Sequence, residues 1–122
     1  MKILIKNGNL VSAAGILTTD LFVEDGSISA AGSIPGSGRE DRVIEAAGMF
    51  LLPGGVDPHV HMHLPSAEGY SSDDFLSGSR AALFGGTTTI IDFVTPARGE
   101  ALPDALKKRM LEAESSLTDY TF

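Results

Sequence analysis

The stretch TTTIIDFV, residues 87–94, constrains the fold of this chain more than any other feature of its sequence. This β-branched run is typical of a strand that is covered on both faces. Helical patterns flank it at SSDDFLSGSRAALFGG and GEALPDALKKRMLEAESS, and shorter strand patterns lie beyond them at GGVDPHVHM and LTDYTF. Strands that alternate with helices form parallel sheets with right-handed crossovers. The second part of the chain is therefore expected to fold as β-α-β-α-β, which makes the class α/β.

Both helix patterns carry signals for their ends and faces. A serine at 71 or 72 is expected to cap the first helix, with Asp73 and Asp74 in its first turn and a glycine pair at 85–86 as its stop. Pro103 suits the first turn of the second helix. The residues expected to face inward are Phe75, Leu76, Ala81, Ala82 and Leu83 on the first helix, and Leu106, Met110 and Leu111 on the second.

The first fifty residues predict short strands and turns, as in a small β-sheet or part of a β-sandwich. Asp25-Gly26 is a favoured two-residue hairpin turn. Asn7-Gly8 is interpreted as a turn, and RVIEAAGMFLLPG as a strand pair around Ala47-Gly48. Residues 32–41, GSIPGSGRED, are expected to form a loop. The boundary is placed after residue 52, which gives a β segment 1–52 and an α/β segment 53–122.

Charge and composition exclude several classes of partner. Nine basic residues against sixteen acidic ones give a net charge of −7, which argues against nucleic acid and against an anionic membrane surface. The chain has no cysteine, so a metal would have to be held by histidine and carboxylate. The apolar run at the N-terminus is too short for a signal peptide, and no stretch approaches a membrane span. We therefore expect a cytoplasmic protein.

All three histidines of the chain lie in one stretch, at His59, His61 and His63. Residues i and i+2 of a strand point to the same face, so His59 and His61 should converge from one side and offer two positions to a divalent ion. A His-x-His pair also occurs on exposed strands, where its role is structural or solvated. The position of His59 and His61 favours metal binding over a structural role, because reactive groups of such α/β folds gather at the carboxyl ends of strands.

These residues also carry a resemblance. PGGVDPHVHMHLP, followed by SSDDFLSGSRAALFGGTTTIIDFV, resembles the amidohydrolase superfamily, and within it the dihydropyrimidinase and hydantoinase branch. The opening ILIKNGNLV and the lead-in GMFLLPGGVD are similar to the N-terminus of that family, so the resemblance covers nearly the whole chain. It implies a β-sandwich portion at 1–52 and, at 53–122, the start of a (β/α)8 TIM-like barrel that is incomplete in this chain.

The resemblance further implies a hydrolase that opens the C–N amide bond of dihydropyrimidine- or hydantoin-type rings through a metal-activated hydroxide. His59 and His61 match the metal-binding pair, and the complete subunit is expected to hold two zinc ions and to assemble as a dimer or tetramer. His63 and Leu64 are the candidates for substrate contacts, and the alternatives are a hydrogen-bonding role in the loop for His63 and loop packing for Leu64. An arginine stands at position 63 in dihydroorotase-like members, and the histidine here favours an uncharged cyclic amide. Asp57 and Asp92 are expected to bond nearby amides, and the alternative for Asp92 is to orient a neighbouring residue near the site.

Three strands cannot close a barrel, so the sequence is interpreted as an N-terminal fragment that is inactive alone and prone to self-association. The general base and the remaining ligands, which the resemblance implies to include a carboxylated lysine bridging the two ions, are expected beyond Phe122. Lys107 and Lys108 are not candidates for that lysine, because their side of the helix is expected to face outward. Other interpretations stay open at this stage. They are a catalytically inactive scaffold of the same branch, a dihydroorotase- or allantoinase-type enzyme, and an unrelated small β-α protein with a surface histidine cluster.

Overall fold

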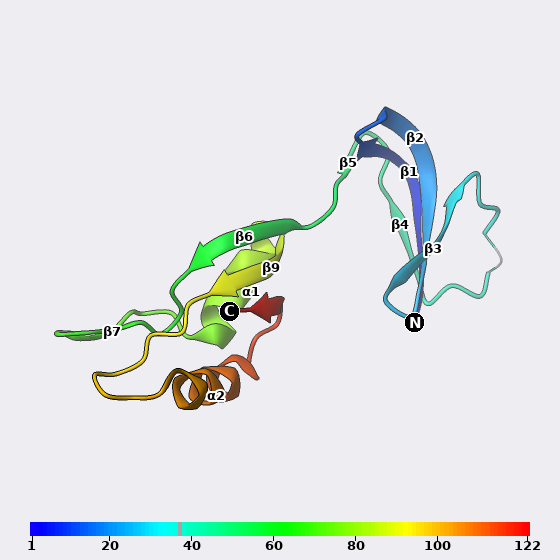
Figure 1. The fold of residues 1–122 in the computed structure, drawn as a ribbon. Helices are drawn as coiled ribbons and strands as arrows, with labels where there is room; N and C mark the ends of the chain where they lie inside the picture. The colour runs from blue at the N-terminus through cyan, green and yellow to red at the C-terminus, as the bar shows by residue number, and fades with distance from the viewer. Residues whose placement is uncertain (37) are drawn as a thin grey trace. The chain divides into compact units, whose positions relative to one another are not determined.

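The computed structural model describes residues 1–36 and 38–122 and divides the chain into two compact units, Met1–Pro53 and Gly54–Phe122. The first unit consists of strands, and in the second unit strands alternate with helices (Figure 1). The chain is thus a mixed α/β protein, as expected. Residue 37, in the loop expected at 32–41, lies outside the described residues.

The first unit is a five-stranded sheet built around its first strand. Its strands are β1 (Lys2–Ser12), β2 (Gly15–Glu24), β3 (Ser27–Gly32), β4 (Arg42–Glu45) and β5 (Phe50–Leu51). The order is β3-β2-β1-β4, with β5 also paired to β1. The β1–β2 and β2–β3 pairs are antiparallel, and the hairpin turn at Asp25-Gly26 is confirmed, with φ of 50° and 82° at its two residues.

The turn predicted at Asn7-Gly8 is wrong, whereas the turn predicted at Ala47-Gly48 forms, with the Met49 amide donating to the Ala46 carbonyl at 2.9 Å, but the strands on either side of it do not pair with each other. Asn7-Gly8 does not reverse the chain, because β1 continues through it with a bulge where the register shifts between Ile5 and Gly8. Asn7 adopts φ of 60°, which asparagine tolerates, and its amide donates to Asp20 Oδ1 at 2.8 Å. The predicted strand pair at Ala47-Gly48 is also absent from the described sheet, since β4 and β5 both pair in parallel with β1 instead of with each other.

The second unit has the predicted β-α-β-α-β order. Its main elements are β6 (Gly55–Val60), α1 (Phe75–Phe84), β9 (Thr87–Asp92), α2 (Leu102–Ala113) and β10 (Asp119–Thr121). The sheet order is β10-β9-β6, and both pairs are parallel. A small hairpin, β7 (Pro65–Ser66) with β8 (Gly69–Tyr70), follows β6. The central position of β9 explains its sequence, because Ile90 is fully buried against Phe75 and Ala113.

The first helix begins later than predicted. Its N-cap is Asp74, whose Oδ1 accepts the Ser77 amide at 2.8 Å, while the Asp74 amide donates to Ser77 Oγ at 3.1 Å. This reciprocal capping box satisfies two free amides at once. The stop at the glycine pair is confirmed, with Gly85 as C-cap and Gly86 at φ of 85°.

The buried faces of both helices also differ from the prediction. The buried residues are Phe75, Gly78 and Ser79 on α1, and Ala105, Arg109 and Ala113 on α2. Leu76, Ala81 and Leu83 of α1 are exposed, as are Leu106, Met110 and Leu111 of α2. Four of these six residues are small and allow close packing, so the rotation of each helix follows them and not the leucines. Within the described part of the chain, neither helix is long and apolar enough to span a membrane.

Candidate metal centre

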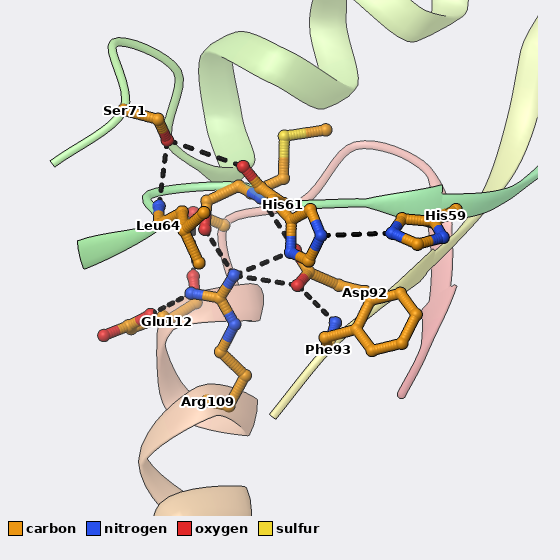
Figure 2. Close-up of polar contacts among 10 residues, drawn as sticks. His59, His61, Leu64, Ser71, Asp92, Phe93, Arg109 and Glu112 are labelled. Carbon is orange, nitrogen blue, oxygen red and sulfur yellow. Dashed lines mark hydrogen bonds and ion pairs between the residues drawn. The ribbon is translucent and has the colours of Figure 1, made fainter. Parts of the chain in front are cut away.

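His59 and His61 meet at the carboxyl end of β6. His59 lies in the strand, which ends at Val60, and His61 is the next residue. Their Nε2 atoms are 3.1 Å apart, and the two rings are nearly perpendicular, with centroids 5.0 Å apart and an interplanar angle of 74°. Figure 2 shows the two side chains side by side, with the ring nitrogens directed toward each other. The spacing of two therefore brings the imidazoles together as the strand period predicts.

This separation fits two ligands of one small divalent ion. Zinc binds histidine nitrogen at about 2.0–2.1 Å, so two nitrogens of a tetrahedral site lie about 3.3 Å apart. Without an ion, the same distance suits one N–H···N hydrogen bond between the imidazoles. No group of three or more potential metal ligands occurs among residues 1–36 and 38–122. The pair can therefore supply two positions of a coordination shell, and other groups would have to supply the rest.

Asp57 and Phe93 contact the two histidines but supply no further metal ligand. Asp57 Oδ1 accepts the backbone amide of His59 at 3.1 Å, so this carboxylate bonds an amide as the sequence indicates. The Phe93 ring packs against both imidazoles, with centroids 4.6 Å from His59 and 5.1 Å from His61. It restricts the rotation of both rings. Phe93 was not among the residues predicted from the sequence, although its place directly after the central strand was a usable signal.

His63 leaves the face that His59 and His61 share. Its φ of 47° turns the chain, and its amide donates to the Asp73 carbonyl at 2.6 Å. Its ring stacks on Tyr70 of the small hairpin, with centroids 4.0 Å apart and 14° between the planes. His63 and Tyr70 both line a cavity of about 130 Å³ that extends along α2. The third histidine is thus placed beside the candidate metal pair and in a cavity wall.

Leu64 follows His63 and is held through its backbone. Its amide donates to Ser71 Oγ at 2.9 Å, and its carbonyl accepts the Ser71 amide at 2.9 Å. Ser71 Oγ also lies 3.4 Å from the His61 carbonyl, to which it donates. These contacts, of which Figure 2 draws the two made by Ser71 Oγ, fix the start of the loop between β6 and α1. The Leu64 side chain is half-buried.

A buried ion pair lies under this loop. Asp92, at the end of β9, is 1% exposed, and both its carboxylate oxygens lie 2.9 Å from Arg109 Nη2. Asp92 also accepts the amides of Met62 and Phe93, and Arg109 donates to the Met62 carbonyl (Figure 2). Amide bonding by Asp92 was expected. Arg109 was missed, because it follows two lysines in a helix predicted to bury leucine and methionine.

Comparison with known proteins finds D-hydantoinases and dihydropyrimidinases as relatives. No protein-family model matches the chain. The D-hydantoinase of Geobacillus stearothermophilus is 45% identical over 121 residues, which cover 98% of this chain and 25% of the relative. Dihydropyrimidinase 2 of Caenorhabditis briggsae is 48% identical over 104 residues, which cover 84% of this chain and 20% of the relative. A D-hydantoinase crystal structure superposes with a TM-score of 0.92 at 40% identity, covering 100% of this chain and 26% of that one.

These matches confirm the resemblance predicted from the sequence, and they do so in both sequence and fold. The chain is related to the hydrolases of the amidohydrolase superfamily. Within that superfamily, its relatives are the D-hydantoinases and dihydropyrimidinases. The chain spans between a fifth and a quarter of the length of the curated relatives it matches.

Proposed function

We propose that this sequence is part of a metal-dependent cyclic amidohydrolase that opens dihydropyrimidine- or hydantoin-type rings at a C–N amide bond. The relationship to D-hydantoinases and dihydropyrimidinases supports the reaction class. The single observation in this chain that supports a metal site is the 3.1 Å separation of the Nε2 atoms of His59 and His61. In the complete protein, residues 1–52 would belong to a β-sandwich and residues 53–122 would begin a (β/α)8 barrel.

His59 and His61 are the proposed metal ligands, and the complete subunit is proposed to hold two divalent ions, of which zinc is the expected one. A divalent ion at this position would act as a Lewis acid and lower the pKa of water. The protein's part is to direct the two Nε2 atoms at one point, while the Phe93 ring holds the imidazoles in place. The complete protein is further proposed to be cytoplasmic and to assemble as a dimer or tetramer.

His63 and Leu64 are the proposed substrate contacts. Both lie in the segment that leaves β6, and His63 with Tyr70 forms part of the wall of the 130 Å³ cavity. A neutral ring substrate suits this wall, because an imidazole is a weaker carboxylate ligand than a guanidinium fork. The general base and the remaining metal ligands belong to other parts of the proposed enzyme.

The proposal is tested with the intact protein and a double variant, His59→Ala with His61→Ala. Zinc affinity, measured by competition with a chelator, should fall by more than about 100-fold, since even residues that only support a ligand change affinity 10–100-fold. Hydrolysis of hydantoin and dihydrouracil should be lost with it. The matched control is His63→Asn, which should keep the zinc affinity and change KM.

Two results would contradict the proposal in different ways. Unchanged zinc affinity in the double alanine variant would remove His59 and His61 from the metal site. An intact wild-type protein that holds no zinc and opens neither ring would point to a non-catalytic member of the branch.

A further inference from the structure

The residue that follows the second candidate ligand is held at both of its peptide groups. The Met62 amide donates to Asp92 Oδ2 at 2.9 Å, and the Met62 carbonyl accepts from Arg109 Nη2. The Met62 side chain packs closely on α1 as well, because its sulfur would overlap a Cβ placed on Gly78. Met62 therefore has little freedom, and neither does the backbone of His61 directly before it.

Asp92 also fixes the other side of the imidazole pair. Its Oδ1 accepts the amide of Phe93, and the ring of Phe93 packs against both His59 and His61. One buried carboxylate thus orders the strand end that carries the histidines and the strand end that carries the ring beside them. Figure 2 shows Asp92 between these two segments.

Arg109 completes this arrangement from α2. Its Nη1 donates to Glu112 at 2.6 Å, and its guanidinium carbon lies 4.6 Å from the centre of the Phe75 ring at the start of α1. The side chain is 10% exposed, and that of Asp92 is fully buried. Arg109 therefore connects α2, the start of α1, the end of β9 and the turn at Met62.

Stability alone does not account for such a pair. Removing two charges from water costs about as much as their attraction returns, and apolar residues of similar volume often replace buried pairs without loss. Apolar residues could not, however, bond both peptide groups of Met62. The buried Arg109 Nε has no hydrogen-bond partner in the described structure, which adds to the cost of keeping this side chain inside.

We propose that Asp92 and Arg109 are positioning residues that hold the Nε2 atoms of His59 and His61 ready for a divalent ion. The inference rests on the proposed function, because it takes the two histidines as metal ligands. Its physical basis is that a ligand pair held within about 0.5 Å of its binding geometry needs no rearrangement when the ion enters. Groups that orient metal ligands in this way typically change metal affinity 10–100-fold.

The test is a titration of the metal-free intact protein with Co²⁺, followed by its visible absorption, with zinc competition for the affinity. Arg109→Met and Asp92→Asn should each weaken binding about 10–100-fold and alter the cobalt absorption band, which reports ligand geometry. Arg109→Lys keeps the positive charge beside Asp92 but lacks the forked donors of the guanidinium. Its cobalt affinity should therefore lie between those of wild type and Arg109→Met. The matched control is Lys108→Met on the same helix, which removes an exposed cation paired with Glu100 and should bind cobalt as wild type does.

Folding is followed in the same samples by urea unfolding without metal. If a single variant does not fold, the double variant Asp92→Asn with Arg109→Met decides, because it leaves no unpaired buried charge. Wild-type affinity and an unchanged cobalt band in a folded variant would overturn the positioning role. Failure of the proposed function looks different, since cobalt binding would then be insensitive to His59→Ala with His61→Ala in an otherwise wild-type protein.

Discussion

At the scale of single residues, the sequence predicts a side chain well where one strand sets its direction. His59 and His61 are two apart at the end of one strand, and their nitrogens meet as the strand spacing predicts. Arg109 could not be predicted in the same way. It follows Lys107 and Lys108, and the choice of which basic residue turns inward depends on the rotation of α2, which Ala105 and Ala113 set.

Asp20 illustrates a residue whose role follows from contacts between distant segments. Its Oδ1 accepts the amide of Asn7 at 2.8 Å, and its Oδ2 accepts the amide of Ile34 at 3.1 Å. These two bonds, the one from Asn7 first, hold the pKa of the Asp20 carboxyl below its ordinary value. The ionised form of Asp20 therefore stabilises the bulge in β1.

The sign of the resulting pH dependence follows from this lowered pKa. The stabilisation is fully present above the unfolded-state pKa of about 3.9 and is lost as the pH falls through the lower folded-state pKa. Asp20→Asn should therefore reduce the loss of stability of the intact protein in that acid range. Urea midpoints recorded at a series of pH values measure the effect, with Glu68→Gln as a control in the other unit. Parallel curves for wild type and Asp20→Asn would show that Asp20 plays no such part.

At the scale of elements, Gly54 shows how a close approach fixes the entry into β6. A Cβ on Gly54 would lie 2.7 Å from the Cβ of Thr88 and closer still to the rest of that side chain. Thr88 is β-branched and stands in β9, so its side chain cannot rotate freely away. Gly54 thus allows the chain to pass directly beside the central strand.

Gly54→Ala should therefore destabilise the protein by about 1–3 kcal/mol, the usual cost of forcing extra volume into a packed site. The urea midpoint of the intact protein measures it. Gly85→Ala is the matched control, because Gly85 has an ordinary helical φ of −83° and a Cβ there would come no closer than 3.4 Å to its nearest neighbour. Equal midpoints for Gly54→Ala and wild type would mean that Thr88 moves aside without cost.

The order of the elements could be predicted from the sequence, but several of their faces and pairings could not. Alternating patterns were enough to predict the β-α-β-α-β order, and Asp25-Gly26 was enough for its hairpin. The bulge at Asn7 and the parallel pairing of β4 and β5 with β1 depend on partners far along the chain. Local patterns do not contain that information, so the first was interpreted as a turn and the second as a strand pair.

At the scale of the whole molecule, the second unit has an apolar surface that the described residues leave uncovered. An open apolar cavity of about 320 Å³ is lined mainly by Ile91, Phe93, Val94, Leu102, Leu106 and Phe122. The strands β6 and β10 pair only with β9 within the described sheet, so each has one free edge. Free edges and apolar surface together favour association with other chains.

We therefore expect the 122-residue chain, produced alone, to self-associate and to open no hydantoin ring. Its sedimentation coefficient should rise with concentration, and it should bind a fluorescent hydrophobic dye, because the uncovered apolar surface remains available. Replacing Leu102 and Leu106 by glutamate should reduce both effects, since these leucines line the open cavity. The matched control is Lys107→Glu with Lys108→Glu on the same helix, which changes charge without removing apolar surface. A monomer whose sedimentation coefficient does not change with concentration, which unfolds cooperatively and binds no dye, would show that residues 1–122 form a self-sufficient domain.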